Sequence, residues 1–512
     1  MLIKVFGAAV QGIDATLITI EVNSSRGCMF YLVGLPDSAV KESHQRIISA
    51  LQVNGYRMPT SNIVINMAPA DIRKEGAAYD LPLAIGILAA SEVIQSDKLE
   101  RYLLMGELSL DGSLQPIKGA LPIAIKAREL GFEGMIVPQQ NAHEAAVVNN
   151  LKVYGAGNIK EVIEFFNGTQ ELTPTLVNTR EEFYSQQSNF DFDFAEVKGQ
   201  ENVKRALEVA ASGSHNILLI GSPGSGKSML AKRLPSILPP LSLGESLETT
   251  KIHSVAGKLG KDGGLISKRP FRAPHHTIST VAMTGGGSFP QPGEISLAHN
   301  GILYIAELQE YSRNVLEVLR QPLEDRKITV SRIRCNVEYP ASFMLVASMN
   351  PCPCGYYTHP TKACVCSPGQ VQKYLNRISG PLLDRIDLQI EVTPLPFEEM
   401  ADSRPGESSA TIRERVIRAR QIQEARYADI PGIYCNAQMN SKLLARHARP
   451  DDKGLAMLKT AMNRLNLSAR AYDRILKVSR TIADLEGCEL IQPAHLAEAI
   501  GYRNLDREDW AG

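Results

Sequence analysis

The segment 221–228 constrains the fold of this chain more than any other part of the sequence. A strand-forming run over 216–220 precedes it, and a helix-forming run over 229–234 follows it. A strand, a glycine-rich loop and a helix in this order are typical of a phosphate-binding loop. The segment therefore predicts a nucleotide site in an α/β domain with a parallel sheet and crossover helices.

The residue types in this segment match the groups of a bound triphosphate. Glycines leave room for backbone N–H groups to surround phosphate oxygens, and the Lys227 ammonium reaches the β- and γ-phosphates. The Ser228 hydroxyl can bind Mg²⁺. We expect every residue of the segment to contribute to an ATP site: Gly221, Ser222, Pro223, Gly224, Ser225, Gly226, Lys227 and Ser228.

The apolar run 301–305 has the features of a Walker B strand. Such a strand normally ends in Asp-Glu, where Asp positions Mg²⁺ and Glu polarises the attacking water. Here the run is followed by Ala306 and Glu307, so the Asp is absent and Glu307 is the candidate base. Loss of one carboxylate should weaken Mg²⁺ positioning more than ATP binding. We therefore expect ATP binding, with an ATPase activity that Ala306 weakens.

Two polar residues later in this region are candidates for contacts with a γ-phosphate. Asn350 comes after the run 343–348 and is a candidate sensor of the γ-phosphate, although a turn or cap residue before Pro351 would look the same. Arg385 lies in the segment 381–387 and could stabilise the γ-phosphate of a neighbouring subunit, which implies a ring. The alternative for Arg385 is a surface ion pair with Asp384 or Asp387.

Length and composition indicate a multidomain α/β protein without a membrane span. The chain has 512 residues, with Lys+Arg and Asp+Glu both at 55, so global charge does not favour nucleic acid. No run of about 18 apolar residues occurs, and we expect no membrane partner and a cytoplasmic location. The pattern divides the chain into an α+β domain (1–167), a linker (168–193), the nucleotide core (194–395) and a helical C-terminal domain (396–512).

Four longer motifs show that the chain closely resembles the YifB/ComM family of magnesium-chelatase-like AAA+ ATPases. They are the segments 271–277 (Phe-Arg-Ala-Pro-His-His-Thr), 292–301, 320–325 and 349–355 (Met-Asn-Pro-Cys-Pro-Cys-Gly). The resemblance extends over nearly the whole chain. It implies a P-loop AAA+ core, Mg²⁺ and ATP as cofactors, a homohexameric ring, an arginine finger at Arg385 and a sensor-2 arginine at Arg470 in a helical C-terminal lid. The family has Asp at the position of Ala306.

The same resemblance implies that residues 1–167 are similar to the Lon protease domain, an α+β fold of the ribosomal S5 domain 2 type. The positions of the Lon serine nucleophile and its lysine base are Ala78 and Leu121 in this chain. A Ser-Lys mechanism needs both groups. We therefore expect a docking or assembly module without peptidase activity.

Four cysteines crowd between 352 and 366 as two Cys-x-Cys pairs, which are Cys352, Cys354, Cys364 and Cys366. Four thiolates can form a tetrahedral Zn²⁺ site, and His359 is an alternative to one of them. The spacing within each pair is shorter than usual for zinc, so buried thiols and redox chemistry remain alternatives.

Two basic segments are candidates for contacts with a polyanion. Residues 327–339 alternate apolar side chains with Lys327, Arg332 and Arg334, which predicts a hairpin that either faces a ring pore or is simply solvated. The helix near 412–422 carries several arginines, and we expect it to present them to solvent, with a Glu414–Arg418 pair.

The resemblance favours an ATP-dependent DNA motor, because the family implies DNA translocation and branch migration that support recombination during DNA uptake. One alternative is a magnesium-chelatase-like chaperone or assembly subunit whose partner is a protein. Another, suggested by Ala306, is a scaffold that binds ATP and assembles without appreciable turnover.

Overall fold

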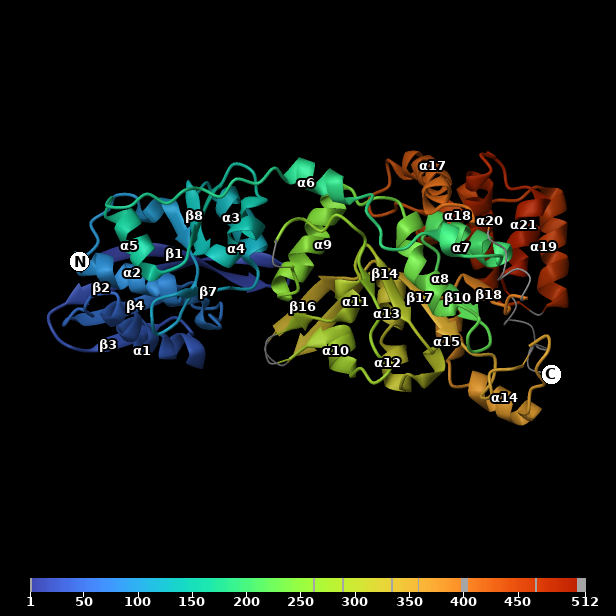
Figure 1. The fold of residues 1–512 in the computed structure, drawn as a ribbon, viewed down its shortest axis with the longest axis horizontal. Helices are drawn as coiled ribbons and strands as arrows, with labels where there is room; N and C mark the ends of the chain where they lie inside the picture. The colour runs from blue at the N-terminus through green and yellow to red at the C-terminus, as the bar shows by residue number, and fades with distance from the viewer. Residues whose placement is uncertain are drawn as a thin grey trace.

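A computed structural model of the chain describes residues 2–260, 263–287, 290–332, 335–357, 359–396, 404–465 and 467–503. Figure 1 shows an elongated molecule in which the N-terminal part, a central sheet and a C-terminal group of helices follow one another along the long axis. In the described ranges, no helix is both long enough and apolar enough to cross a lipid bilayer.

The N-terminal part is built on a seven-stranded mixed sheet. In spatial order its strands are β3 (Phe30–Val33), β4 (Asn62–Ala68), β2 (Asp14–Ser25), β1 (Leu2–Gln11), β5 (Tyr102–Leu104), β8 (Gly134–Pro138) and β9 (Lys152–Ala156). β2 runs antiparallel to both β1 and β4, whereas β1, β5, β8 and β9 are parallel. A small antiparallel hairpin is formed by β6 (Glu107–Leu108) and β7 (Leu114–Gln115).

Alternating apolar residues bury one face of this sheet beneath helices. Ile18, Ile20 and Val22 of β2 are buried, as every second residue of a half-buried strand should be. α2 is buried along its whole length, because it packs against β1 and β2. The helices of this part are α1 (Ser38–Val53), α2 (Asp80–Ala90), α3 (Ala120–Glu129), α4 (Gln139–Ala146) and α5 (Ile159–Phe166), with the 3-10 turns η1 (Ala77–Tyr79) and η2 (Leu99–Arg101).

The central sheet has five strands, and all its pairings are parallel. In spatial order they are β11 (Phe271–Arg272), β14 (Ile302–Ile305), β17 (Met344–Met349), β10 (Ile217–Ile220) and β18 (Leu388–Glu391). The three middle strands are buried along their whole length, as continuous apolar runs predict. Parallel strands bring their carboxyl ends to one edge, so the segments that follow β10, β14 and β17 meet there.

Short helices and hairpins surround this sheet. The helices are α7 (Glu201–Gly213), α8 (Lys227–Arg233), α9 (Leu243–Val255), α10 (Thr280–Thr284), α11 (Glu294–Leu297), α12 (Arg313–Glu317), α13 (Arg320–Asp325), α14 (Pro368–Leu375) and α15 (Gly380–Leu383), with η3 (Phe194–Glu196), η4 (Leu234–Ile237) and η5 (Leu308–Glu310). The hairpins are β12 (Gly285–Gly286) with β13 (Gln291–Pro292), and β15 (Lys327–Arg332) with β16 (Cys335–Pro340).

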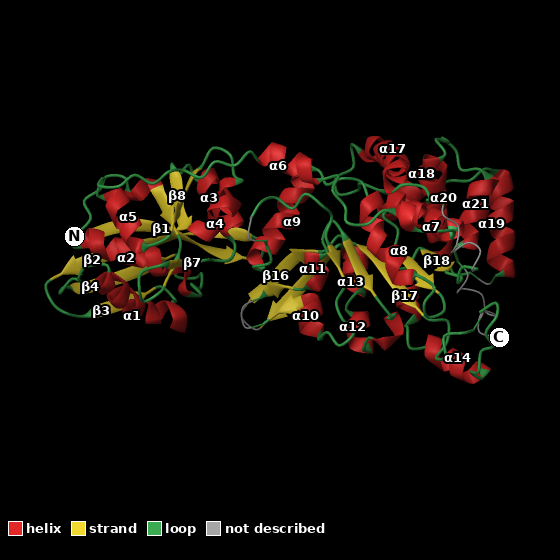
Figure 2. Ribbon diagram, viewed as in Figure 1, coloured by secondary structure: helices red, strands yellow, loops and turns green. Residues whose placement is uncertain are grey.

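The C-terminal group shows only helices and loops among its described residues (Figure 2). It comprises α17 (Ser409–Tyr427), η6 (Asn436–Gln438), α18 (Ser441–His447), α19 (Asp452–Arg464), α20 (Ala469–Leu485) and α21 (Pro493–Gly501). α17 and α20 pack on α7, and their apolar residues join one hydrophobic core with one face of the central sheet. This group is therefore fixed to the core by buried contacts.

The expectation of a solvated arginine face on α17 is wrong for Arg413, Arg415 and Arg420, whereas Arg418 is exposed as expected. Arg413 donates to the carbonyl of Leu238 at 3.0 Å, and Arg420 donates to the Ser214 hydroxyl at 2.8 Å. Arg415 forms ion pairs with Glu208 and Glu407. These side chains bind the helix to the core, because α17 lies against α7 and η4 and its arginines meet carbonyls and carboxylates there.

The segment 168–193, which we expected to be a linker, carries α6 (Thr179–Gln186). Phe183 is only 2% exposed and anchors this helix, an effect that the polar average composition of the segment conceals. The Asn178 side chain accepts from the Glu181 N–H and caps the first turn.

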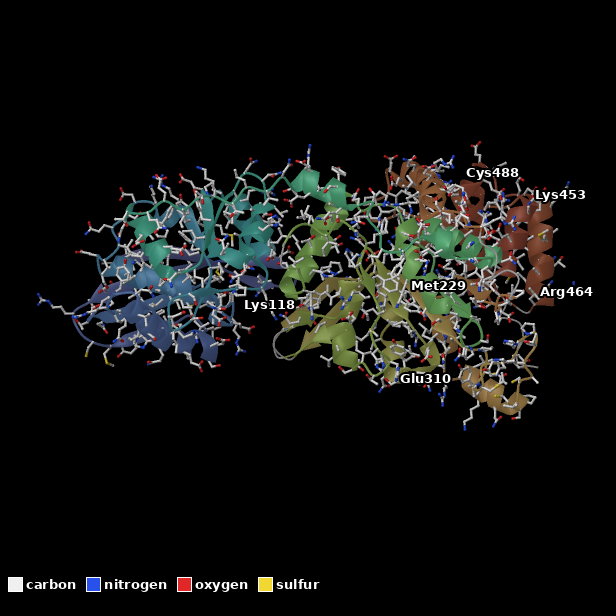
Figure 3. All side chains as sticks on the ribbon, viewed as in Figure 1. Lys118, Met229, Glu310, Lys453, Arg464 and Cys488 are labelled. Atoms are coloured by element: carbon white, nitrogen blue, oxygen red, sulfur yellow. The ribbon has the colours of Figure 1, made fainter. Side chains whose placement is uncertain are left out.

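The N-terminal part contacts the core through α3, α4 and α9. The Gly119 N–H donates to the Ser254 carbonyl at 3.1 Å, and the Ser254 hydroxyl donates to the Glu144 carboxylate. Burial raises the pKa of Glu144, although hydrogen bonds from the Ser254 hydroxyl, the Leu121 N–H and the Asn141 side chain oppose the shift. Lys118 lies at this junction in Figure 3, beside Gly257 of the core.

Candidate nucleotide-binding site

The segment 221–228 forms a loop between the carboxyl end of β10 and the first turn of α8. Gly224 and Gly226 have φ angles of 80° and 92°, which glycine adopts without strain. Lys227 Nζ donates to the carbonyls of Gly221 and Ser222 at 2.7 and 2.8 Å. The lysine side chain thus folds back over its own loop, at the place where the terminal phosphates of a nucleotide lie in phosphate-binding loops.

The loop has spare hydrogen-bonding capacity that fits a triphosphate. The hydroxyls of Ser222 and Ser225 are buried and have no hydrogen-bond partner among the described residues. Buried polar groups normally have partners, so an anion with several acceptor oxygens would satisfy them. A Cβ at Gly221 would lie 2.4 Å from the Val392 carbonyl oxygen, so this position requires glycine.

Gln200, which was not among the predicted site residues, supports the loop from outside. Its side-chain amide donates to the carbonyls of Ser225 and Thr393, both at 3.1 Å. Gln200 has a φ of 57°, the left-handed region that few residues other than glycine adopt. No motif marks this residue in the sequence, because its partners are distant along the chain.

The end of β14 lies beside the start of α8. Ser228 Oγ is 2.9 Å from the Tyr304 hydroxyl, which is 3.0 Å from Ser348 Oγ. Glu307 is exposed and has a φ of 55°, and its N–H donates to Ser348 Oγ at 3.4 Å. The structure therefore brings the candidate metal ligand Ser228 and the candidate base Glu307 to one edge of the sheet. When bound, Mg²⁺ neutralises charge on the β- and γ-phosphates.

Asn350 follows β17 and reaches the same edge. Its side-chain oxygen is 3.3 Å from Lys227 Nζ, and its carbonyl accepts from the Tyr374 hydroxyl at 3.2 Å. Burial lowers the pKa of Lys227 to about 8, and the nearby Glu307 carboxylate opposes this shift. The structure thus assembles four of the predicted residues: Lys227, Ser228, Glu307 and Asn350.

Arg385 and Arg470 lie at the opposite edge of the sheet. The Arg385 carbonyl accepts from Asn216, which precedes β10, whereas the phosphate loop follows β10. A strand of four residues spans about 13 Å. Arg470 lies nearby, because it forms an ion pair with Asp384 at 2.9 Å. Neither arginine is therefore placed at the phosphate loop of its own chain.

The partner of Arg385 differs from both expected carboxylates. Arg385 is 7% exposed, and its guanidinium forms an ion pair with Glu324 rather than with Asp384 or Asp387. Its Nε atom is buried without a partner in the described part of the chain. The reason is tertiary, because Glu324 belongs to α13, far from Arg385 along the chain.

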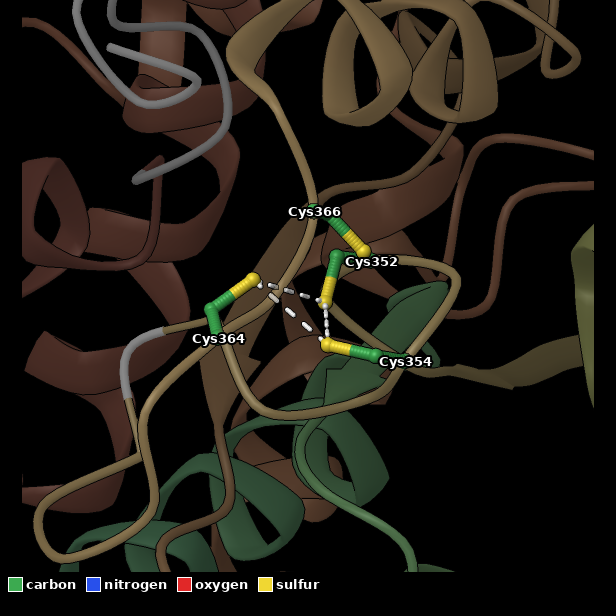
Figure 4. Close-up of side chains that lie close together, drawn as sticks. All are labelled: Cys352, Cys354, Cys364 and Cys366. Carbon is green, nitrogen blue, oxygen red and sulfur yellow. Dashed lines mark hydrogen bonds between the residues drawn. The ribbon is translucent and has the colours of Figure 1, made fainter.

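The four cysteines gather in the loop between β17 and α14, as Figure 4 shows. The sulfur of Cys352 lies 3.3 Å from that of Cys354 and 3.6 Å from that of Cys364. All four sulfurs lie within 4.8 Å of one another. Four thiolates around Zn²⁺, with bonds of about 2.3 Å, have sulfurs about 3.8 Å apart, so the donor set and its dimensions fit.

His359 does not join this group. Its Nδ1 accepts from the backbone N–H groups of Thr361 and Lys362 at 3.2 and 3.0 Å. The pKa of the Cys354 thiol lies below its usual range, because burial is outweighed by N–H donors of Tyr356 and Val365 and by the neighbouring thiols. The pKa values of the Cys364 and Cys366 thiols are raised instead, because a backbone N–H donor is outweighed by burial and the neighbouring thiols. The case for a metal therefore rests on the positions of the four sulfurs.

The cysteine loop touches the phosphate loop. A Cβ at Gly355, whose φ is 82°, would lie 2.6 Å from Pro223 Cδ. The two loops therefore pack without space between them, a contact that the sequence did not predict. Any change in the cysteine loop should reach the nucleotide site through this contact and through Asn350.

Three family models match the chain in succession. They are described as subunit ChlI of Mg-chelatase (residues 20–141), magnesium chelatase, subunit ChlI (193–400), and its C-terminal region (406–503). The competence protein ComM of Haemophilus influenzae is 45% identical over 98% of this chain and 97% of its own length. The protein YifB of Escherichia coli is 43% identical over 98% of this chain and 96% of its own length.

A more distant similarity is confined to part of the chain. The magnesium-chelatase 38 kDa subunit of Rhodobacter capsulatus is 26% identical over 31% of this chain and half of its own length. The family models and the full-length similarities agree with the phosphate loop and the parallel sheet described above. The chain belongs to the ComM/YifB family of magnesium-chelatase-like AAA+ proteins.

Proposed function

We propose that this protein is the subunit of an ATP-dependent ring motor that acts on DNA. Membership of the family implies the use of ATP and Mg²⁺. The site residues proposed are the loop 221–228 for ATP, Ser228 for Mg²⁺, Glu307 as base, and Asn350 with Arg385 and Arg470 at the γ-phosphate. AAA+ relatives usually assemble into oligomers, and we propose a homohexamer.

One observation carries this proposal: Arg385 and Arg470 lie at the sheet edge opposite the phosphate loop. A finger arginine that cannot reach its own nucleotide can act only on the nucleotide of a neighbour. Head-to-tail contacts between identical subunits form a ring when the rotation between neighbours closes, and we propose such a ring here. The ion pair with Glu324 would then hold Arg385 in the single subunit until a neighbour supplies the phosphate.

Mixed assemblies test this arrangement directly. Lys227→Ala and Arg385→Ala should each abolish ATP turnover when alone. In an equal mixture, about a quarter of interfaces combine an intact loop with an intact arginine, so part of the activity should return. Lys232→Ala is the control, because Lys232 is an exposed lysine of the same helix α8. An equal mixture as inactive as each variant alone would contradict action between subunits.

DNA as the substrate is supported by kinship alone. A relative that is 45% identical carries the name competence protein, and the sequence resemblance implies DNA translocation during DNA uptake. The hairpin β15–β16 adds little support, because Lys327 already forms an ion pair with Glu338 at 2.9 Å. Arg334 of this hairpin lies outside the described residues.

ATPase measured with and without forked DNA, together with sedimentation in a non-hydrolysable ATP analogue, separates the candidate functions. Turnover stimulated by DNA is expected for the motor. Turnover indifferent to DNA would favour the chaperone or assembly subunit with a protein partner.

A second candidate function follows from Ala306, which leaves the end of β14 without the metal-positioning Asp. The protein would then assemble on ATP binding without appreciable turnover. Ala306→Asp tests this scaffold: turnover should rise from a low value. High turnover in the parent protein that the substitution leaves unchanged would contradict it.

We also propose a structural Zn²⁺ at Cys352, Cys354, Cys364 and Cys366, supported by the sulfur spacing. Elemental analysis of reduced protein purified without chelator should give about one zinc per chain. Cys354→Ser should lose it, whereas Cys28→Ser should keep it, because Cys28 is exposed and outside the cluster. A metal-free parent protein would favour free thiols.

For the N-terminal part we propose a Lon-like docking or assembly module. Ala78 and Leu121 occupy the positions of the Lon serine and lysine, and Leu121 is fully buried in α3. The proposed domains are 1–167, 168–193, 194–395 and, as a lid, 396–512. Peptidase assays should show no cleavage, and removal of residues 1–167 should impair assembly.

A further inference from the structure

Tyr304 and Ala306 share one face of the end of β14. Residues two apart along a strand point to the same side, so Tyr304 points to the side on which an Asp at 306 would lie. The two positions are about 6.6 Å apart along the strand, a distance that the long phenol spans. The Tyr304 hydroxyl thereby reaches Ser228 Oγ at 2.9 Å.

A serine that binds Mg²⁺ must turn its lone pairs toward the metal, so its proton needs an acceptor on the other side. In P-loop enzymes the metal shell combines this hydroxyl with a Walker B Asp. No carboxylate stands at 306 in this chain. Among the described residues, the Ser228 hydroxyl is within hydrogen-bond distance of the Tyr304 oxygen.

The Tyr304 hydroxyl is held in place on both sides. It is 3.0 Å from Ser348 Oγ, which also accepts from the Glu307 N–H at 3.4 Å. Its ring stacks on Phe271 of the neighbouring strand, with centroids 5.8 Å apart and planes at 30°. Tyr304 is 3% exposed, so solvent hardly reaches it.

We propose that Tyr304 is a positioning residue that accepts the hydrogen bond of the Ser228 hydroxyl in place of the absent Asp. The Ser228 O–H donates a hydrogen bond to the Tyr304 oxygen, and the Tyr304 O–H donates one to Ser348 Oγ. Both lone pairs of Ser228 that remain are then free to face Mg²⁺. This inference rests on the proposed function of the site and assigns it a residue that the motifs do not contain.

The exchange of a carboxylate for a phenol has a measurable consequence. A phenol orients Ser228 but brings no negative charge toward the metal. The parent protein should therefore need a higher Mg²⁺ concentration for tight nucleotide binding than a variant with Asp at 306. Its metal-independent affinity for the phosphates, through the loop and Lys227, should be the same. The effect of Tyr304 should be confined to the metal-dependent part of nucleotide binding.

Calorimetric titration of ATPγS tests this, first in EDTA and then at graded Mg²⁺ concentrations. Four proteins are compared: the parent, Tyr304→Phe, Ala306→Asp and the double variant. Tyr304→Phe should bind ATPγS in EDTA like the parent and should need about tenfold more Mg²⁺ for half-maximal enhancement. Ala306→Asp should need less Mg²⁺ than the parent, and in the double variant it should remove the effect of Tyr304→Phe.

Tyr339→Phe is the matched control. Like Tyr304, Tyr339 is a buried tyrosine with a hydrogen-bonded hydroxyl. Its hydroxyl donates to the carbonyl of Pro290 at 2.7 Å, and the residue lies in β16, away from the phosphate loop. It should leave the Mg²⁺ dependence unchanged. If Tyr304→Phe does not fold, Ser348→Ala breaks the far end of the same contact and should also raise the Mg²⁺ requirement.

The outcomes separate this inference from the proposed function. No ATPγS binding by the parent under any condition would refute the nucleotide site itself. Binding by the parent with the same Mg²⁺ dependence in Tyr304→Phe would overturn only the role of Tyr304. Equal shifts in Tyr304→Phe and Tyr339→Phe would also overturn it, because they would indicate a general loss of packing.

Discussion

Lys227 Nζ lies 3.3 Å from the side-chain oxygen of Asn350, and this contact joins the phosphate loop to the end of β17. The two residues come from different motifs, 123 positions apart in the chain. The parallel pairing of β10 with β17 brings them together, with Ile220 opposite Met349. The contact with Asn350 thus helps to hold the Lys227 side chain in a partly buried position in the absence of nucleotide.

ATP binding should weaken as the pH rises above 8. Burial lowers the pKa of Lys227 to about 8, so the free protein loses the ammonium above that pH. A bound triphosphate favours the charged form, and binding must then take up a proton. Affinity should fall by up to about tenfold per pH unit between pH 8 and 10. Calorimetry in buffers of different ionisation enthalpy should show this proton uptake at pH 9 and little at pH 7.

Gly355→Ala should weaken ATP binding from outside the loop. An added Cβ would lie 2.6 Å from Pro223 Cδ, and the φ of 82° is unfavourable for alanine. We expect a loss of about 1–2 kcal/mol of stability and a clear fall in ATPγS affinity. Gly369→Ala is the control, because nothing lies within 4 Å of its added Cβ. Equal ATPγS affinity in both variants would show that the cysteine loop does not influence the nucleotide site.

Gln200→Ala should loosen the phosphate loop without touching any phosphate. The substitution removes two hydrogen bonds, to Ser225 and Thr393, and leaves alanine at a φ of 57°. Each such bond contributes about 1 kcal/mol. Thermal unfolding should shift to lower temperature, and ATPγS should restore part of the loss because it orders the same loop. A melting temperature equal to that of the parent would contradict this role.

Stability should fall as the pH drops below about 6.5, the usual pKa of histidine. His215 is fully buried between Asp387 and Thr481, and burial lowers its pKa although Asp387 opposes the shift. Below pH 6.5, His215 is therefore protonated in the unfolded chain but stays neutral in the folded chain. This costs up to about 1.4 kcal/mol per pH unit between pH 6.5 and the lower pKa of the folded state.

His215→Asn should flatten this pH dependence while lowering stability at pH 7. His275→Asn serves as the control, because His275 is exposed in a loop. Denaturant unfolding from pH 5 to 8 measures both. A slope below pH 6.5 that is the same in His215→Asn and the parent would assign it to other groups.

Local patterns predicted the elements that carry the loop. The strand at 217–220 and the helix at 227–233 lie where the apolar run, the glycines and Lys227 place them. Likewise, continuous apolar runs identified β14 and β17 as buried strands. Individual strands and helices depend mainly on residues that are close together in the chain. They can therefore be predicted from the sequence.

Contacts between residues far apart in the chain could not be predicted from the sequence. Arg385 meets Glu324 instead of its neighbours, and Arg415 of α17 meets Glu208 of α7 instead of solvent. A charge pattern on one helix does not indicate which carboxylates the fold brings to it. Long polar side chains take their partners from whatever surface packs against them.

The sequence by itself determined the phosphate loop, the missing Asp at 306 and the cysteine pairs, because each is a local arrangement of residue types. Only the tertiary structure placed Tyr304 against Ser228, Gly355 against Pro223, and Arg385 at the far edge of the sheet. The physical reason is that the order of the parallel strands and the packing of the helices decide which distant side chains meet. Neither can be inferred from one local segment of the sequence.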